Sequence, residues 1–267
     1  MSTHEMVEEE ELYARFTFFQ MFTHVLVMIT FVLLVMTGLP QKFWYAPWAH
    51  FVGSLFGGAE SMRKVHHTSG IISAFGLVFH FGYLIYRWVT ENWKSLYNDF
   101  IMVPNPNDGW AIVQNFKYWL FLTDEPAEYD EIGWKEKLDY WAVCYGTIVF
   151  TITGLMMWFS HIATKIVPAW SLYIAWTLHS YEAFLATLVI FIWHFYNVHL
   201  MPEKFPIGTT MWYSGKANTE DMVDEHLAFY KELKGIPSGK TGLNRLRRGK
   251  VRNRDANTGG FIPREHS

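Results

Sequence analysis

The sequence predicts an all-α membrane protein, in which a four-transmembrane-helix bundle carries amphipathic surface helices and an extended cytoplasmic C-terminal tail. Hydrophobic residues make up 51% of the 267 residues and aromatic residues 18%, while the charged residues are crowded into a few segments. Such clustering is typical of membrane proteins. In addition, four apolar stretches each come close to the about 20 residues that a spanning helix needs, and three of these stretches contain histidines.

The predicted elements follow from where the apolar stretches begin and end. Residues 1–11 are acidic, whereas a secretory signal begins with a basic stretch, so the first apolar stretch is expected to be retained. The predicted order is a cytoplasmic N-terminal segment at 1–15, a transmembrane domain at 16–200 with helices at 16–39, 66–89, 138–160 and 174–198, and a cytoplasmic tail at 201–267.

The lysines and arginines predict the orientation. Only four of the 22 lie in the first and third loops, namely Lys42, Arg63, Lys64 and Lys165, and the remaining eighteen lie on the opposite side. Short loops on the cytoplasmic side of a membrane carry an excess of lysine and arginine. Both termini are therefore expected in the cytoplasm. The chain is therefore predicted to be a multi-pass protein of the cell inner (cytoplasmic) membrane.

Two short surface helices are predicted outside the spans. The loop at 40–65 holds Trp44, Tyr45 and Trp48 among prolines, which suits the membrane interface. Residues 110–122 have an amphipathic pattern after a turn rich in proline and asparagine. The segments 90–137 and 203–267 carry no core signal of their own, which predicts surfaces for partner subunits.

One cysteine and five histidines lie within the apolar stretches, and they limit which cofactors the chain could bind. Cys144 cannot supply a disulfide framework, a covalent haem attachment or an iron–sulfur ligand set. Histidine is costly inside a membrane and usually faces the bundle interior for a functional reason. The five are His24 in the first helix, His66 and His80 in the second, and His179 and His194 in the fourth.

The histidine spacings predict two layers. His66 and His80 are 14 residues apart and His179 and His194 are 15 apart, which separates the members of each pair by roughly 21–22 Å along a helix. Haem iron accepts two axial imidazoles, so each layer could hold one b-type haem. His66 and His179 share the outer layer, and His24, His80 and His194 are the candidates for the inner iron. For a single histidine, an interhelical hydrogen bond is the alternative.

The stretch QMFTHVLVMITFVLLVMTGLP at 20–40 and the pattern Arg63-x-x-His66-x-x-x-Gly70 resemble the gamma subunit of membrane-bound formate dehydrogenase and the related hydrogenase and thiosulfate reductase cytochromes b. The resemblance covers about residues 15–200. It implies that His66 pairs with His179 and that His24 pairs with His194, both on haem iron. The family spacing in the fourth helix is 14 residues, one fewer than in this sequence.

His80 leaves a second assignment open. The second helix with its paired histidines is similar to that of the cytochrome b of quinol–cytochrome c complexes, and by that analogy His80 holds the inner iron. The motif around His24 favours His24. Two further stretches, EKLDYWAVCYGTIVFTITGLMMWF at 136–159 and HSYEAFLATLVIFIWHFYNVHLMPEKFPIGTTMWYSGK at 179–216, resemble members of this family that work beside multihaem c-type cytochromes.

These features predict transmembrane electron transfer through two haem b groups, between menaquinone or ubiquinone and a partner redox subunit. Candidate quinone contacts are Gln114, Asn115 and Asn197. Expected partners are iron–sulfur or multihaem c-type cytochrome subunits and membrane lipid, and no nucleic acid. The alternatives are a self-standing haem-based membrane reductase or oxidase, and a non-redox transporter or anchor that uses the histidines as a proton path.

Overall fold

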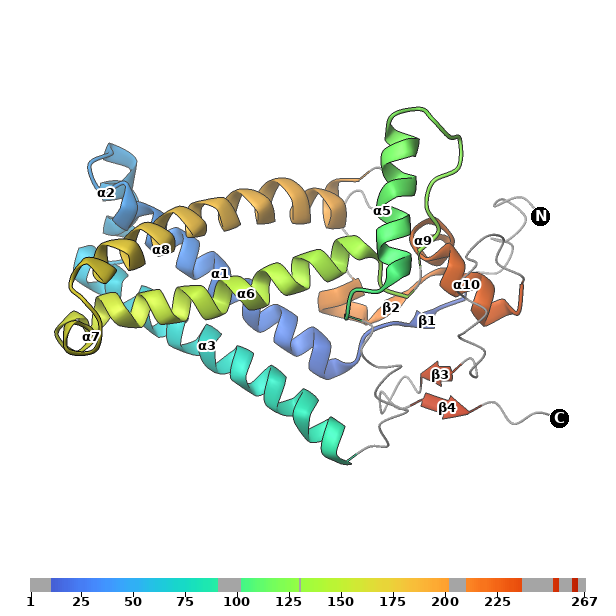
Figure 1. Cartoon of the computed structure of the whole chain (residues 1–267), viewed down its shortest axis with the longest axis horizontal. Helices are drawn as coiled ribbons and strands as arrows, with labels where there is room; N and C mark the ends of the chain where they lie inside the picture. Colours follow the sequence, from blue (N-terminus) through green and yellow to red (C-terminus); the bar gives the residue numbers. More distant parts are fainter. Residues whose placement is uncertain are drawn as a thin grey trace. The chain divides into compact units, whose positions relative to one another are not determined.

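Four long helices dominate the computed structural model (Figure 1). The structure describes residues 11–90, 102–129, 131–201, 210–236, 252–254 and 261–263. The chain divides into two compact units, which we describe separately. We call Phe22–Thr90 with Trp141–Ile207 the spanning unit, and Met1–Met21 with Glu91–Tyr140 and Gly208–Ser267 the polar unit.

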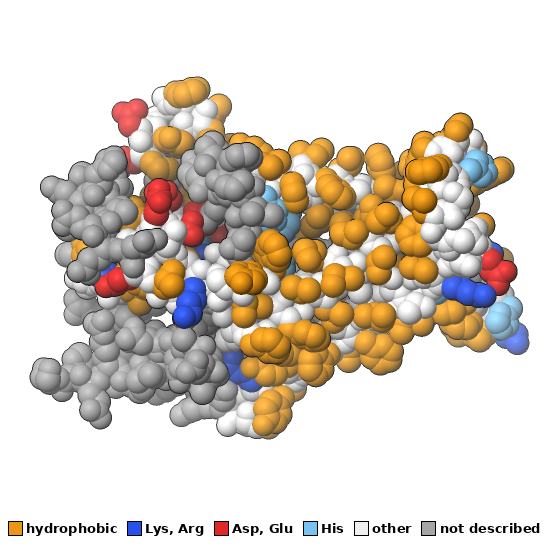
Figure 2. Space-filling model, turned by 180° about the vertical axis from the view of Figure 1, so that it is seen from behind, with side chains coloured by type: hydrophobic (Ala, Val, Ile, Leu, Met, Phe, Trp, Pro, Cys, Tyr) orange, Lys and Arg blue, Asp and Glu red, His pale blue; other side chains and the backbone are white. Residues whose placement is uncertain are grey.

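The four long helices are each long and apolar enough to cross a membrane. They are α1 (Phe18–Lys42), α3 (Ala59–Thr90), α6 (Trp134–Trp158) and α8 (Trp170–Leu188), the last continued to Leu200 by the π-helical turns η2 (Val189–His194) and η3 (Tyr196–Leu200). Their outward apolar side chains are exposed, with Phe75 at 70% and Val78 at 69%. In Figure 2, hydrophobic side chains accordingly cover much of the surface of the long helices. The prediction of an all-α membrane protein with four spanning helices is confirmed.

The helices extend beyond the apolar stretches that were used to predict them. α3 begins at Ala59 instead of 66, and α8 begins at Trp170 instead of 174. The first turns of α3 are polar, and the 2.8 Å ion pair between Glu60 and Lys64 spans one of them. Pairs of this kind, four residues apart, favour a helix without adding hydropathy, so a search for apolar residues misses such turns.

Short helices connect the long ones at one end of the spanning unit. α2 (Pro47–Leu55) lies between α1 and α3, and α7 (Ser160–Ile166) lies between α6 and α8. α2 begins with Pro47 at its first position, where the missing N–H costs no hydrogen bond. It is the short surface helix predicted within 40–65.

The polar unit contains α5 (Pro106–Trp119), which corresponds to the amphipathic helix predicted at 110–122. The helix starts earlier than predicted because Asn105 and Asp108 form a capping box, in which each side chain accepts from the other's backbone N–H. Asp108 also forms a buried ion pair with Lys137, in which Oδ2 and Nζ are 2.8 Å apart. The predicted turn is therefore the cap of this helix.

The polar unit also has a small core, although its segments carry no core signal in the sequence. β1 (Tyr13–Ala14) pairs antiparallel with β2 (Lys216–Ala217). Gly215, with φ of 66°, lets the chain turn into β2, and its carbonyl accepts from the N–H groups of Arg15 and Phe16. The other elements are η4 (Thr210–Ser214), α9 (Thr219–Glu225), α10 (Leu227–Lys234), β3 (Arg252–Arg254) and β4 (Phe261–Pro263).

This core joins segments about 200 residues apart in the sequence. Met222, Val223 and Tyr230 are buried together with Tyr13 packed against them. Beside them, the buried guanidinium of Arg15 lies 2.5 Å from Nε2 of His226, and burial lowers the pKa of Arg15 from its usual value. Because the residues of this core come from distant parts of the sequence, no single stretch of the sequence shows that a core forms there. Of the predicted tail at 201–267, residues 202–209, 237–251, 255–260 and 264–267 lie outside the described residues.

Candidate functional site

The structure brings His66 of α3 and His179 of α8 together in the spanning unit. Their ring centres are 6.3 Å apart, with 62° between the ring planes. We call these two residues the 66/179 pair. They come from the two helices that the sequence analysis paired in its outer layer.

A second pair lies at another level of the same helices. The ring centres of His24 on α1 and His194 in η2 are 6.4 Å apart, and we call them the 24/194 pair. α1 and α3 run antiparallel, because Gly38 lies against His66 and Gly76 lies against Leu26. His24 is 14 residues before Gly38, so the two levels are separated by roughly 21 Å along α1.

Both ring separations match two imidazoles on opposite sides of one metal ion. Two metal–imidazole bonds of about 2.0–2.1 Å, each followed by roughly 1 Å from the nitrogen to the ring centre, place the ring centres about 6 Å apart. The measured values are 6.3 and 6.4 Å. The neighbouring rings of His66 and His67 are also 6.4 Å apart, so the fit rests on the joining of different helices as well as on the spacing. The residues present therefore fit a pair of bis-histidine haems.

Thr37 on α1 holds the imidazole of His66. Its hydroxyl donates to the carbonyl of Leu33 at 2.6 Å and lies 2.9 Å from Nδ1 of His66. A hydroxyl has only one proton to donate, so its oxygen must accept from the N–H at Nδ1. His66 then carries its proton on Nδ1, which leaves the lone pair of Nε2 available for a metal.

Thr153 on α6 makes the same arrangement with His179. Its hydroxyl donates to the carbonyl of Val149 at 2.6 Å, and its oxygen lies 2.9 Å from Nδ1 of His179. Thr37 is fully buried and Thr153 is 6% exposed, so water does not replace either bond. Both imidazoles of the 66/179 pair are thus held with the proton on Nδ1.

A glycine follows each of these threonines and leaves room for the ring. A Cβ added to Gly38 would lie 3.0 Å from Cε1 of His66, and one added to Gly154 would lie 3.3 Å from Cε1 of His179. Both distances are tighter than ordinary carbon contacts. Each Thr-Gly dipeptide therefore forms a cradle for one imidazole, and no larger residue fits at its second position without moving the ring.

Comparison with sequence families identifies the family of the chain. The family model described as prokaryotic cytochrome b561 matches residues 15–206, which include all four helices and both histidine pairs. The chain belongs to the prokaryotic cytochrome b561 family. Membership implies haem b as the cofactor, and with the four helices it makes this cytochrome b561 family member a multi-pass membrane protein that carries electrons. A search of curated proteins finds no match to the chain.

The π-helical turns decide the register of His194 in this cytochrome b561 family member. The resemblance implied a 14-residue spacing after His179, whereas the sequence has 15. A π-helical stretch takes up one extra residue without moving the following residues to another face. η2 ends at His194, so the extra residue is absorbed before the second histidine and the ring still reaches His24.

The other histidines of the spans have different surroundings. The ring of His80 contacts that of Phe81 at 5.7 Å, and the ring of His67 stacks on Trp158 at 4.0 Å. By the pairing of α1 with α3, His80 lies at about the level of His24. Which of these two residues ligates iron stays a prediction, although His24 is the residue whose ring faces His194 at the spacing of a ligand pair.

The predicted quinone contacts lie in both units and have partners within the chain. Gln114 donates to the carbonyl of Glu125 at 2.8 Å, and Asn197 donates to the carbonyl of Trp193 at 2.7 Å. Asn115 is buried and donates to the hydroxyl of Tyr129. Burial raises the pKa of Tyr129, and the bond from Asn115 opposes that rise. A quinone at Asn115 would have to displace this bond.

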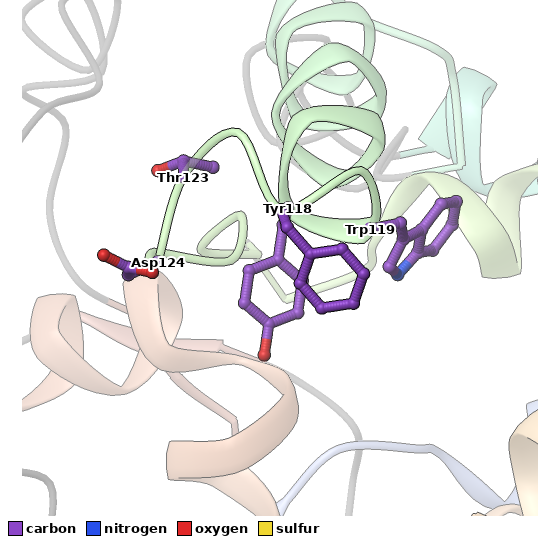
Figure 3. A pocket seen from close by; sticks show the side chains of 5 residues that line it. Tyr118, Trp119, Thr123 and Asp124 are labelled. Carbon is purple, nitrogen blue, oxygen red and sulfur yellow. The ribbon is translucent and has the colours of Figure 1, made fainter.

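A hollow in the polar unit is lined by Tyr118, Trp119, Phe121, Thr123 and Asp124 (Figure 3). It contains no histidine and thus no axial ligand for haem. Within the described ranges, no cluster of three or more histidine, cysteine or acidic side chains could hold a metal ion. The histidines that the structure brings together in the spanning unit form pairs, and two axial histidines are what a bis-histidine haem needs.

The sequence analysis named the histidines but missed the threonines that hold them. A signal was present, because Thr-Gly-Leu occurs at 37–39 and again at 153–155. In each case the tripeptide lies on the helix that precedes a histidine-bearing helix. The tripeptide is too short to identify a repeat until the two histidines are seen against it.

Proposed function

We propose that this chain passes electrons across the inner membrane through two bis-histidine b haems, one at the 66/179 pair and one at the 24/194 pair, between a membrane quinone and a partner redox subunit. The observation that carries the proposal is the pair of ring separations, 6.3 and 6.4 Å, at two levels of four spanning helices. When bound, each haem supplies a one-electron iron couple.

The chain's own residues supply the ligands and the insulation. His66 and His179 would hold one haem, and His24 and His194 would hold the other. The apolar helices around them provide an environment in which a porphyrin is soluble and water is scarce. Low polarity also limits reorganisation around a group that changes charge, which suits electron transfer.

Bis-histidine ligation favours electron transfer over chemistry at the metal. If two histidines held each iron, no coordination position would remain for a substrate or for oxygen. This counts against the alternative of a self-standing haem reductase or oxidase that binds its substrate on iron. The substrate of the whole complex would then react on another subunit, such as an iron–sulfur or multihaem c-type protein.

The quinone is proposed as the mobile reactant because it dissolves in the membrane beside the helices. Menaquinone and ubiquinone both meet this condition. The predicted contacts for its ring remain Gln114, Asn115 and Asn197. On the predicted orientation these residues face the cytoplasm, so protons of quinone chemistry would be exchanged there.

Haem content tests the proposal. We expect the purified chain, produced with ample haem, to contain two haem b per polypeptide by the pyridine haemochrome assay. His179→Ala and His194→Ala should each reduce this to one, because each removes an axial ligand of a different site, and the double variant should be colourless. His161→Ala is the matched control, since His161 is an exposed residue of α7, and should retain two. A colourless wild-type protein, or two haems in both single variants, would refute the proposal.

A further inference from the structure

We propose that Thr37 and Thr153 are positioning residues for one haem alone, and that they lower the reduction potential of the haem at the 66/179 pair relative to the haem at the 24/194 pair. The inference rests on the proposed function, because it assumes that both pairs bind haem. It assigns to two buried hydroxyls a role that neither the family match nor the histidine geometry assigns.

The first step is the direction of each hydrogen bond. Each threonine hydroxyl gives its proton to a backbone carbonyl one turn earlier, at 2.6 Å in both cases. Each oxygen therefore accepts from the histidine N–H, at 2.9 Å in both cases. The bond to the carbonyl also polarises the hydroxyl and makes its oxygen a better acceptor.

The second step is the effect on the metal. An imidazole that donates from Nδ1 to an acceptor becomes more basic at Nε2 and donates more charge to the metal. Greater donation favours ferric over ferrous iron, because the ferric ion carries more positive charge. Hydrogen bonding outside the coordination sphere is one of the means by which proteins set haem potentials. Two such bonds act on the 66/179 pair, one for each axial ligand.

The third step is the difference between the two pairs. Nδ1 of His24 is buried and has no hydrogen-bond partner in the part of the chain that the structure describes. At least one ligand of the 24/194 pair thus lacks the bond that both ligands of the 66/179 pair have. Electrons pass spontaneously toward the higher potential, so the threonines favour transfer from the 66/179 pair toward the 24/194 pair.

Redox titration of threonine variants tests the inference. Thr37→Val and Thr153→Val keep the shape of the side chain and remove the hydroxyl. In each, we expect the midpoint potential of one haem to rise and that of the other to stay unchanged. Since a hydrogen bond contributes up to about 1.5 kcal/mol, the ferric–ferrous ratio should change by at most about tenfold, which is about 59 mV for one electron. Titration in a His24→Ala background, which retains only the haem at the 66/179 pair, identifies the haem that moves.

Matched controls separate this effect from loss of the hydroxyl-to-carbonyl bond. Thr30 on α1 and Thr151 on α6 donate to carbonyls one turn earlier, at 2.8 and 2.7 Å, in the same helices as Thr37 and Thr153. Thr30→Val and Thr151→Val should leave both potentials unchanged. Thr37→Ser, which keeps the hydroxyl, should match the wild type even if Thr37→Val fails to retain haem.

The outcomes distinguish the two proposals. If the chain binds no haem, the proposed function fails and the inference that rests on it fails as well. If both haems are bound and the valine variants move neither potential, or move both equally, or the controls move them as much, the inference is overturned while the function stands. A Thr37→Ser variant whose potential shifts as far as that of Thr37→Val would also overturn the inference.

Discussion

Each imidazole of the 66/179 pair uses its two nitrogens differently. Nδ1 donates to a threonine and Nε2 remains free for a metal, so neither nitrogen is left without a role in the apolar interior. Burying an imidazole with an unused polar atom costs free energy, and pairing each ring with a hydroxyl removes part of that cost. The 24/194 pair lacks this at His24, whose buried Nδ1 has no partner among the described residues.

Haem content tests whether His24 or His80 ligates the second haem. We expect His24→Ala to retain one haem per chain, because the ring that faces His194 at 6.4 Å is lost. His80→Ala should retain two, with unchanged absorption spectra. The measurement is the pyridine haemochrome assay together with the ferric low-spin EPR signals. If His80→Ala loses a haem and His24→Ala does not, the ligands of the second site are His80 and His194.

The fourth spanning helix is not a uniform α-helix. It changes from α-helical to π-helical turns at Val189, and His194 is the last residue of η2. Such turns are rare and less favourable than regular ones, and they are often found at functional sites. The π-helical turns that follow α8 allow His179 and His194 to lie on the same face of the helix although they are 15 residues apart.

Changing the length of η2 by one residue tests its role. Ile192 has an exposed side chain in η2, so deleting it should relax the segment to a regular helix with a 14-residue spacing. We expect this deletion to retain both haems. Inserting one alanine after Ile192 should lose the haem of the 24/194 pair and keep the other, because a second extra residue rotates His194 by about 100°. Equal haem content in the two variants would contradict this explanation.

At the scale of the whole molecule, the lysines and arginines are distributed unevenly between the loops of the spanning helices. Only four lysines and arginines lie in the loops that contain α2 and α7, and the other eighteen lie on the opposite side of the spans or in the tail. Because basic residues are preferred in cytoplasmic loops, this distribution predicts that both termini are inside. On this orientation the 66/179 pair lies near the outer surface, where an extracytoplasmic redox partner could approach it.

Cysteine labelling tests the orientation, and the chain is well suited to it. Cys144 is its only cysteine and is buried in α6, so Cys144→Ser provides a background without thiols. In intact spheroplasts, we expect a membrane-impermeant maleimide to label Ser54→Cys, at the exposed end of α2. Asp124→Cys, in the exposed loop after α5, should react only after the cells are opened. The reverse pattern would place the termini outside.

The sequence determined what depends on local composition. Four apolar stretches of spanning length, the short helices beside them and the costly histidines within them could be predicted, because a membrane span is decided mainly by the transfer of its own residues into lipid. The same reasoning could not find the core of the polar unit, since Tyr13 and Met222 meet only after folding. It also placed the ends of the helices a few residues short.

Tertiary structure decided how the histidines are paired and held. Helical spacing gives the face and depth of a residue, but three histidines shared one depth, and only the packing of α1 against α3 and α8 brought His24 to His194. Likewise, Thr37 and Thr153 were ordinary helix residues until His66 and His179 were found at 2.9 Å from them. The contacts that orient a metal ligand join different helices, and so no stretch of the sequence contains them.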